Sequence, residues 1–366
     1  MVTERDAGLT MFNVSKAAVL PLLSSLRLVN SVADHLFYDV GELYRHLGAD
    51  GYAVVTARQR TILGTRDDLS HPSRSEAIAK HVVNLGALAN PEGVILVIDA
   101  ECAPYVTPYA DINVFLAHET GRVASNKGRK VRTASITGVG SSALGTAAFA
   151  WNVSSALDEP VAAIVPGFGL ADILPQALGG WFGFGVENFL RRVGQQWMEW
   201  MAPPLAHAGR RLVLSAPRST RGLQANEPLG FRTGCPGSDI LHAILLKAPD
   251  IVRLYGHSKG ALCIENALRT LPAGRAKHIE VTTFGCAIAE ESNATYEQIL
   301  GNIDGLGQLN SWGNAPKHWI KSCHTTNTKL PLPMRVAQLT HEAQAPQAQA
   351  RRRRRSKELV GFVSAA

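Results

Sequence analysis

A candidate catalytic serine lies in the stretch Tyr255-Gly-His-Ser-Lys-Gly-Ala261, which has Gly-x-Ser-x-Gly spacing around Ser258. The apolar run Ile251–Tyr255 precedes it and the helical pattern Ala261–Leu271 follows, so the sequence predicts a strand, a sharp turn and a helix. A serine on such a turn exposes its hydroxyl, and the two glycines leave room where strand and helix approach each other. We therefore expect Ser258 to act as a nucleophile. The backbone N–H of Lys259 would point at an oxyanion formed on the substrate.

A serine nucleophile needs a general base and an acid to orient that base, and in strand–turn–helix enzymes they follow in the order Ser, acid, His. Asp304 is the only aspartate after Ser258, and it ends an apolar run that breaks at glycines. We expect it to be the acid. His324 follows the strand-like run 318–323 in a loop, which favours it as the base. His318 and His341 remain alternatives.

A second oxyanion donor is expected in a glycine-rich turn after an earlier strand. The apolar run Val161–Val165 ends in Pro-Gly-Phe-Gly-Leu, which lets the backbone approach a substrate oxygen closely. Phe168 or Gly169 would supply that N–H. A plain strand-ending turn is the alternative interpretation.

The elements that must position these groups alternate between short apolar runs and helical patterns. Strands are predicted at 94–98, 160–165, 211–214, 251–255 and 278–284, and helices at 141–157 and 181–201. This alternation is typical of an α/β protein with a mostly parallel central sheet and helices on both faces.

Three regions follow from the pattern. Residues 1–92 are expected to form an N-terminal α+β extension, with a hairpin of 52–56 and 59–63, that either completes the sheet or caps the site. Residues 93–340 would form the α/β domain, with its core at 160–340. Residues 341–366, rich in Ala and Gln and then polybasic, are expected to be disordered.

The region 160–339 resembles the α/β-hydrolase superfamily, and within it lipases and esterases of the class 3 type. The likeness rests on the elbow around Ser258, on Thr282-Thr-Phe-Gly285 and on Asn302-Ile-Asp304. It implies the α/β-hydrolase fold and a serine hydrolase that cleaves a carboxylic ester through an acyl-enzyme, without a metal or organic cofactor. An acyltransferase or thioesterase with the same triad, or a non-catalytic scaffold of this fold, are the alternatives.

A competing motif is Gly138-Val-Gly140-Ser-Ser-Ala143, which imitates the G-x-G-x-x-A fingerprint of dinucleotide-binding proteins. The fingerprint requires a buried strand before it, and residues 131–137 look like a poor one. We interpret the motif as the start of a small-residue helix and expect no bound cofactor.

The charge distribution limits the kinds of partner that the protein is expected to bind. The net charge is +7, but five arginines and Lys357 near the C-terminus carry six of these charges, so the rest of the chain is nearly neutral at +1. This argues against a nucleic-acid-binding groove in the folded body. A weak contact with an anionic membrane remains possible through the polybasic run of Arg351, Arg352, Arg353, Arg354 and Arg355.

The cysteines and the N-terminal residues indicate the cellular compartment of the protein. Five widely scattered cysteines show neither metal-ligand spacing nor a disulfide pattern, which indicates a reducing compartment and hence the cytoplasm. The apolar run 17–26 is interrupted by Pro21, so it is a weak targeting signal that leaves secretion open. The substrate is expected to be a small-molecule or lipid-like ester, and the oligomeric state stays open.

Overall fold

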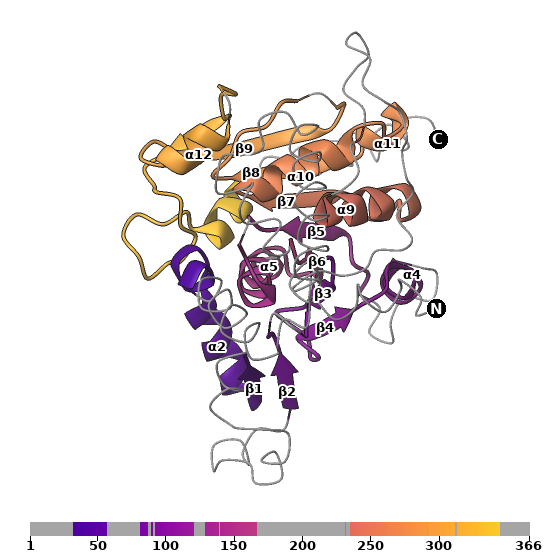
Figure 1. The fold of residues 1–366 in the computed structure, drawn as a ribbon, viewed down its shortest axis with the longest axis vertical. Coiled ribbons are helices and arrows are strands. Elements are labelled where there is room, and N and C mark those ends of the chain that lie inside the picture. The colour runs from indigo at the N-terminus through magenta and orange to yellow at the C-terminus, as the bar shows by residue number, and fades with distance from the viewer. Residues whose placement is uncertain are drawn as a thin grey trace, which may run out of the picture.

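A computed structural model of the chain describes residues 32–56, 81–86, 89–90, 92–120, 129–138, 140–166, 231, 235–290, 292–311 and 313–344. Its centre is an eight-stranded sheet in the order β10-β9-β8-β7-β5-β6-β3-β4 (Figure 1). Neighbouring strands from β6 to β10 are parallel, whereas β3 is antiparallel to both β6 and β4. The predicted α/β class with a mostly parallel sheet is thereby confirmed. The strands of this sheet are β3 (Ile95–Ile98), β4 (Val106–Tyr109), β5 (Thr133–Ile136), β6 (Val161–Ile164), β7 (Arg253–His257), β8 (Glu280–Phe284), β9 (Thr295–Gly301) and β10 (His318–Ile320).

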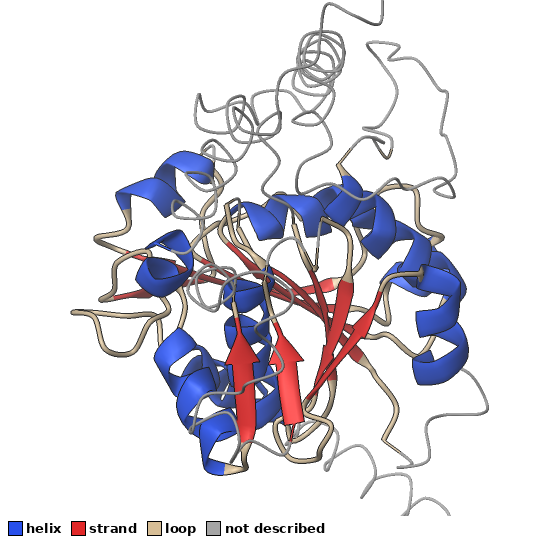
Figure 2. Ribbon diagram, turned by 60° about the horizontal axis from the view of Figure 1, so that its bottom comes forward, coloured by secondary structure: helices blue, strands red, loops and turns tan. Residues whose placement is uncertain are grey.

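Helices cover both faces of the sheet (Figure 2). Helices α9 (Pro236–Lys247) and α10 (Lys259–Leu268) share one hydrophobic core with Leu254 of β7. Helix α5 (Ala143–Leu157) shares the other core with Tyr255, the next residue of the same strand. Successive side chains of a strand point to opposite faces, so a strand covered on both sides reads as a continuous apolar run.

Shorter elements complete the described part. They are β1 (Tyr52–Val55), β2 (His81–Asn84), α2 (Val40–Ala49), α4 (Ile112–Phe115), a π-helical turn (Leu116–Thr120), α11 (Ala273–Ala276) and α12 (Gly305–Asn310). Residues 32–37 and 336–344 are also helical. Among the described residues, no helix has the length and apolar character needed to cross a membrane.

The N-terminal region packs on the face of the sheet that α5 covers. Val40, Leu43 and Leu47 of α2 are buried in the same hydrophobic core as α5. Strand β1 matches the first half of the predicted hairpin, but it pairs in parallel with β2. The predicted partner, 59–63, lies outside the described residues, as do the predicted helix 181–201, the strand 211–214 and the five C-terminal arginines.

One expectation about the sheet is wrong. Residues 131–137 were expected to make a poor buried strand, yet β5 lies between β6 and β7 and all four of its residues are buried. Small residues fit here because both faces of the strand are covered by closely packed helices, and the Thr133 hydroxyl is paired with Glu159. The small-residue helix predicted next is α5, and Ser142 caps its N-terminus.

Candidate active site

Ser258 occupies the turn between β7 and α10 with a strained backbone. Its φ is 55° and its ψ is −133°, a region that residues with a side chain avoid at a cost of about 1–3 kcal/mol. The space around the turn is tight: a Cβ on Gly256 would lie 2.8 Å from the Ala261 Cα, and one on Gly260 would lie 2.3 Å from the Ile136 carbonyl oxygen. Both flanking positions of the motif therefore require glycine, and the turn presents the serine side chain at the end of the sheet.

The three polar side chains predicted for catalysis lie in one hydrogen-bonded row. His324 Nε2 is 2.9 Å from Ser258 Oγ, and His324 Nδ1 is 2.8 and 2.9 Å from the two carboxylate oxygens of Asp304. A carboxylate can only accept, so Nδ1 carries the proton and Nε2 is left to accept the serine hydroxyl. The imidazole is thus in the tautomer that a general base needs.

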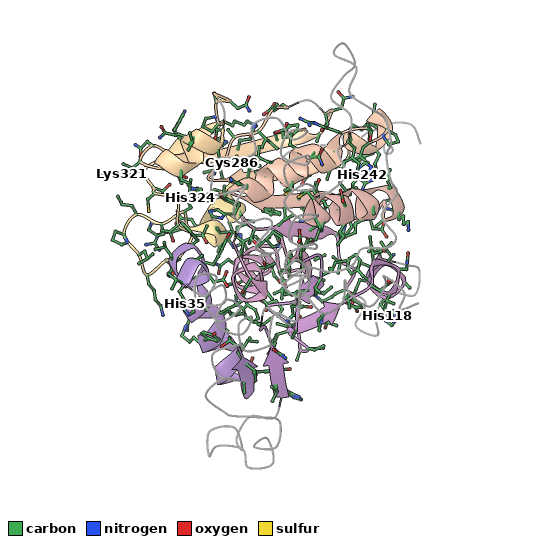
Figure 3. All side chains as sticks on the ribbon, viewed as in Figure 1. His35, His118, His242, Cys286, Lys321 and His324 are labelled. Carbon is green, nitrogen blue, oxygen red and sulfur yellow. The ribbon has the colours of Figure 1, made fainter. Side chains whose placement is uncertain are left out.

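Parallel strands bring these residues together from distant parts of the chain. Ser258 follows β7, Asp304 follows β9 and His324 comes four residues after β10, and the carboxyl ends of these strands share one edge of the sheet. Figure 3 shows His324 on the left of the view near Cys286, whereas His118 and His242 lie on the right.

The two alternative histidines lie elsewhere. The His318 side chain is 53% exposed on the edge strand β10 and pairs with Glu297 of β9. His341 is exposed on the helical segment 336–344. His324 is the histidine whose ring the structure places against Ser258.

Two glycines make room for the acid–base pair. Gly285 has a φ of 65°, and a Cβ there would lie 3.1 Å from the His324 ring and 3.2 Å from Asp304 Oδ2. A Cβ on Gly307 would lie 2.4 Å from the same carboxylate oxygen. Asp304 is only 1% exposed and also caps α12, because its Oδ1 accepts the Gly307 N–H at 2.6 Å. The helix start therefore holds the carboxylate in place.

A thiol lies close to this site without competing as a nucleophile. Cys286 follows Gly285 and is fully buried near the same end of the sheet (Figure 3). Burial raises the pKa of its thiol well above the ordinary range, so the sulfur stays protonated. Its hydrogen-bond acceptors are the carbonyl oxygens of Ala287 and Asn310.

Of the predicted oxyanion donors, the structure describes Lys259 but not Phe168 or Gly169. Lys259 is buried and is the first residue of α10, directly after the serine. Phe168 and Gly169 lie outside the described residues, and β6, the strand before them, is separated from β7 by β5.

Sequence reasoning missed a loop that lies close to the serine, the one that follows β5. A Cβ on Gly138 would lie 2.9 Å from Ser258 Cβ and 3.3 Å from its Oγ. The signal was the Gly-x-Gly motif itself, which was interpreted as the start of a small-residue helix and not as part of the site. Because β5 is the neighbour of β7, the loop at its carboxyl end must border the elbow.

Comparisons with known proteins show no family for this chain. No protein-family model matches the chain, and neither the curated proteins nor the solved structures contain a match. Among the described residues, His, Cys, Asp and Glu side chains form no group of three or more that could hold a metal ion.

Proposed function

We propose that this chain is a serine hydrolase of the α/β-hydrolase fold that cleaves a carboxylic ester. Ser258 is the nucleophile, His324 the general base and Asp304 the group that orients the base. The proposal rests on the position of the His324 ring: its Nε2 lies 2.9 Å from Ser258 Oγ and its Nδ1 lies 2.8 Å from Asp304 Oδ1. These distances are within the range expected for a competent triad.

The proposed reaction has two halves. In the first, Ser258 Oγ attacks the ester carbonyl while its proton passes to His324 Nε2, and the buried Asp304 carboxylate stabilises the imidazolium that forms. His324 then gives this proton to the leaving alcohol, leaving an acyl group on the serine. In the second half, His324 takes a proton from water, the water oxygen attacks the acyl carbon, and the proton returns to Ser258 as the acid leaves.

The backbone N–H of Lys259 is proposed as one oxyanion donor, since in nucleophile elbows the residue after the serine plays this part. A second donor in that fold comes from the loop between a neighbouring strand and its helix. The loop after β5 lies at that position, because Gly138 faces the serine. This placement favours the loop that begins at Gly138 over Phe168 and Gly169.

The position of the elbow in the sheet and the order of the three residues along the chain also support the proposal. The elbow stands at the carboxyl edge of a parallel series of strands, and the order along the chain is Ser, Asp, His. That order is the one found in α/β-hydrolases, and it differs from the orders in chymotrypsin-like and subtilisin-like enzymes.

A fluorophosphonate probe tests the proposal directly, because it labels only serines activated as nucleophiles. We expect the wild-type chain to be labelled and Ser258→Ala to lose the label. Ser322→Ala is the matched control: this serine is buried two residues before His324, and its hydroxyl has no hydrogen-bond partner among the described residues. It should label like the wild type. A folded wild-type protein that resists labelling would refute the enzyme and leave the scaffold alternative.

Substrate class is addressed next with p-nitrophenyl esters of graded acyl length. Release of p-nitrophenol by the wild type, absent in Ser258→Ala, supports hydrolysis. Added alcohols distinguish transfer from hydrolysis, since an acyltransferase would form the new ester in preference to the free acid.

A further inference from the structure

The N-terminal segment of residues 34–39 binds the loop that carries His324. The backbone N–H of Thr326 donates to the Phe37 carbonyl at 2.9 Å, and the Asn327 side chain donates to the His35 carbonyl at 2.7 Å. In Figure 1 the first described residues, in indigo, and the last described residues, in yellow, lie next to each other near α5. Further bonds run from the hydroxyls of Thr325, Thr326 and Thr328 to Leu36, Phe37 and Asp39 respectively.

The same segment also binds the loop that faces the serine. The Asp34 carboxylate is fully buried and accepts the backbone N–H of Ser142 at 3.0 Å, at the start of α5. Its oxygens also contact the hydroxyls of Ser141 and Ser142. Residues 34–39 therefore hold the loop after β5 and the loop after β10 against each other.

Tyr38 connects these two loops to the elbow itself. Its hydroxyl lies 3.1 Å from His257 Nδ1 and accepts the Gly138 N–H at 3.0 Å. His257 is the residue before the nucleophile, and its Nε2 lies 3.0 Å from the carbonyl oxygen of His324. All of these groups are buried, and the phenol ring stands edge-on to the imidazole of His257.

The donor and the acceptor of each hydrogen bond between Gly138, Tyr38, His257 and His324 follow from the chemistry of the groups. The His324 carbonyl can only accept, so His257 Nε2 must carry a hydrogen. Burial, followed by the electrostatic interaction with His324, lowers the pKa of His257 to about 3, so the ring is neutral and Nδ1 bears a lone pair. Tyr38 therefore donates its single hydrogen to Nδ1, and its oxygen is left to accept from Gly138. No member can reverse its bond without leaving a buried partner unmatched.

We propose that Tyr38 is a positioning residue for the base and the nucleophile. This inference rests on the proposed hydrolase function. Through His257 the phenol fixes the backbone of His324, and through Gly138 it fixes the loop against Ser258. The neighbouring Phe37 ring supports the same arrangement, since it packs edge-on against the His324 ring at 5.6 Å. Tyr38 touches neither reacting atom; it sets the distance between His324 Nε2 and Ser258 Oγ.

The test removes the hydroxyl and keeps the ring. Tyr38→Phe leaves the Gly138 N–H without an acceptor and His257 Nδ1 without a donor, and we expect kcat on p-nitrophenyl esters and the fluorophosphonate labelling rate to fall about tenfold or more. KM should stay within about twofold, since no substrate contact is removed. Tyr44→Phe is the matched control: Tyr44 is a half-buried tyrosine of the same N-terminal region, on α2. It should keep the wild-type kcat.

Three further variants separate positioning from mere stability. Val40→Ala removes buried apolar atoms two residues from Tyr38 and should lower the melting temperature without lowering kcat well below that temperature. His257→Gln keeps one N–H donor and one acceptor on a side chain of similar reach, and should retain more activity than His257→Ala. A merely structural role predicts the opposite pattern, with kcat at low temperature unaffected in Tyr38→Phe and no difference between the two His257 variants.

The outcomes separate this inference from the proposed function. If the wild type is labelled at Ser258 and Tyr38→Phe is labelled at the same rate, the positioning role is refuted and the hydrolase stands. If the folded wild type is not labelled at all, the hydrolase is refuted and the positioning role with it. A selective loss of kcat in Tyr38→Phe, absent in Tyr44→Phe and Val40→Ala, establishes the role.

Discussion

The exchange Asp304→Asn tests the acid–base pair because it changes charge and hydrogen-bonding while keeping size. Asp304 Oδ1 accepts the Gly307 N–H at 2.6 Å, and this donor is buried at the start of α12. The single oxygen of the amide must stay with Gly307, where it lies 2.8 Å from His324 Nδ1. This uncharged, shared oxygen is a weaker acceptor for the Nδ1 proton than the carboxylate, and the NH2 group takes the place of Oδ2, 2.9 Å from Nδ1. Its hydrogens oppose a proton on Nδ1 and favour the tautomer with the proton on Nε2. That tautomer cannot accept the proton of Ser258.

The size of the effect follows from two contributions. A carboxylate and an imidazolium with charges about 4 Å apart attract by about 4 kcal/mol at an effective dielectric constant of 20. A tenfold shift of the tautomer balance against catalysis adds about 1.4 kcal/mol. Together these amount to about 5 kcal/mol in the barrier, which predicts a loss of about 10⁴ in kcat. The same exchange in chymotrypsin-like proteases has an effect of about this order.

The assay is the pseudo-first-order rate of fluorophosphonate labelling at pH 7, with thermal unfolding as a check on the fold. Glu297→Gln is the matched control, because Glu297 also pairs with a histidine, the exposed His318, on neighbouring strands. It should label at the wild-type rate. If Asp304→Asn keeps labelling within about tenfold of the wild type while folded, the assignment of Asp304 as the orienting acid is refuted, because the mechanism requires about 10⁴.

Three further predictions concern strain, space and protonation. In denaturant titrations Ser258→Gly should have a free energy of unfolding about 1 kcal/mol larger than that of Ser258→Ala, since glycine tolerates a φ of 55° and alanine does not. Equal free energies of unfolding would show that the backbone at this position is not strained. Gly307→Ala should cost about 1–3 kcal/mol and lower the labelling rate, because its Cβ meets Asp304, whereas Gly305→Ala, with nothing within 4 Å, should be neutral or stabilising by up to about 1 kcal/mol. Burial lowers the pKa of His257 to about 3 in the folded state. As the pH falls from 6.5 toward 3, the imidazole is therefore protonated in the unfolded state before it is in the folded state, and the free energy of unfolding decreases. Unfolding titrations at a series of pH values should show wild type losing about 1.4 kcal/mol per pH unit relative to His257→Gln between about pH 6 and 4, and parallel pH curves would contradict a buried neutral imidazole.

The elbow and the strands around it could be predicted from the sequence because their signals are local. The run 251–255, the glycines around Ser258 and the helix that follows agree with β7 and α10 to within two or three residues at each boundary. Once the strands are parallel, their carboxyl ends share one edge, so residues after β7, β9 and β10 must come close. His324 was preferred over the other histidines for this reason.

Strand β5 and its loop could not be recognised because the local signal is weak. Thr133-Ala-Ser-Ile136 contains two hydroxyl residues and only one large apolar side chain, which in isolation is typical of a surface segment. Its central position depends on the helices that cover both faces, and on the pairing of Thr133 with Glu159. Burial here is a property of the tertiary structure, so the position of Gly138 beside the serine could not be foreseen.

The N-terminal segment was the least predictable part, since its contacts join residues that are far apart in the chain. The bonds from residues 325 and 326 to Leu36 and Phe37 span 289 positions, and the bond from Tyr38 to His257 spans 219. One sequence feature is consistent with them in retrospect: His324 is followed by Thr-Thr-Asn-Thr, four polar residues in a loop close to a buried base. Buried polar side chains need partners, so such a run next to a buried histidine indicates that another segment must supply carbonyl groups. The partner could not be named without the fold, because carbonyl groups occur at every residue.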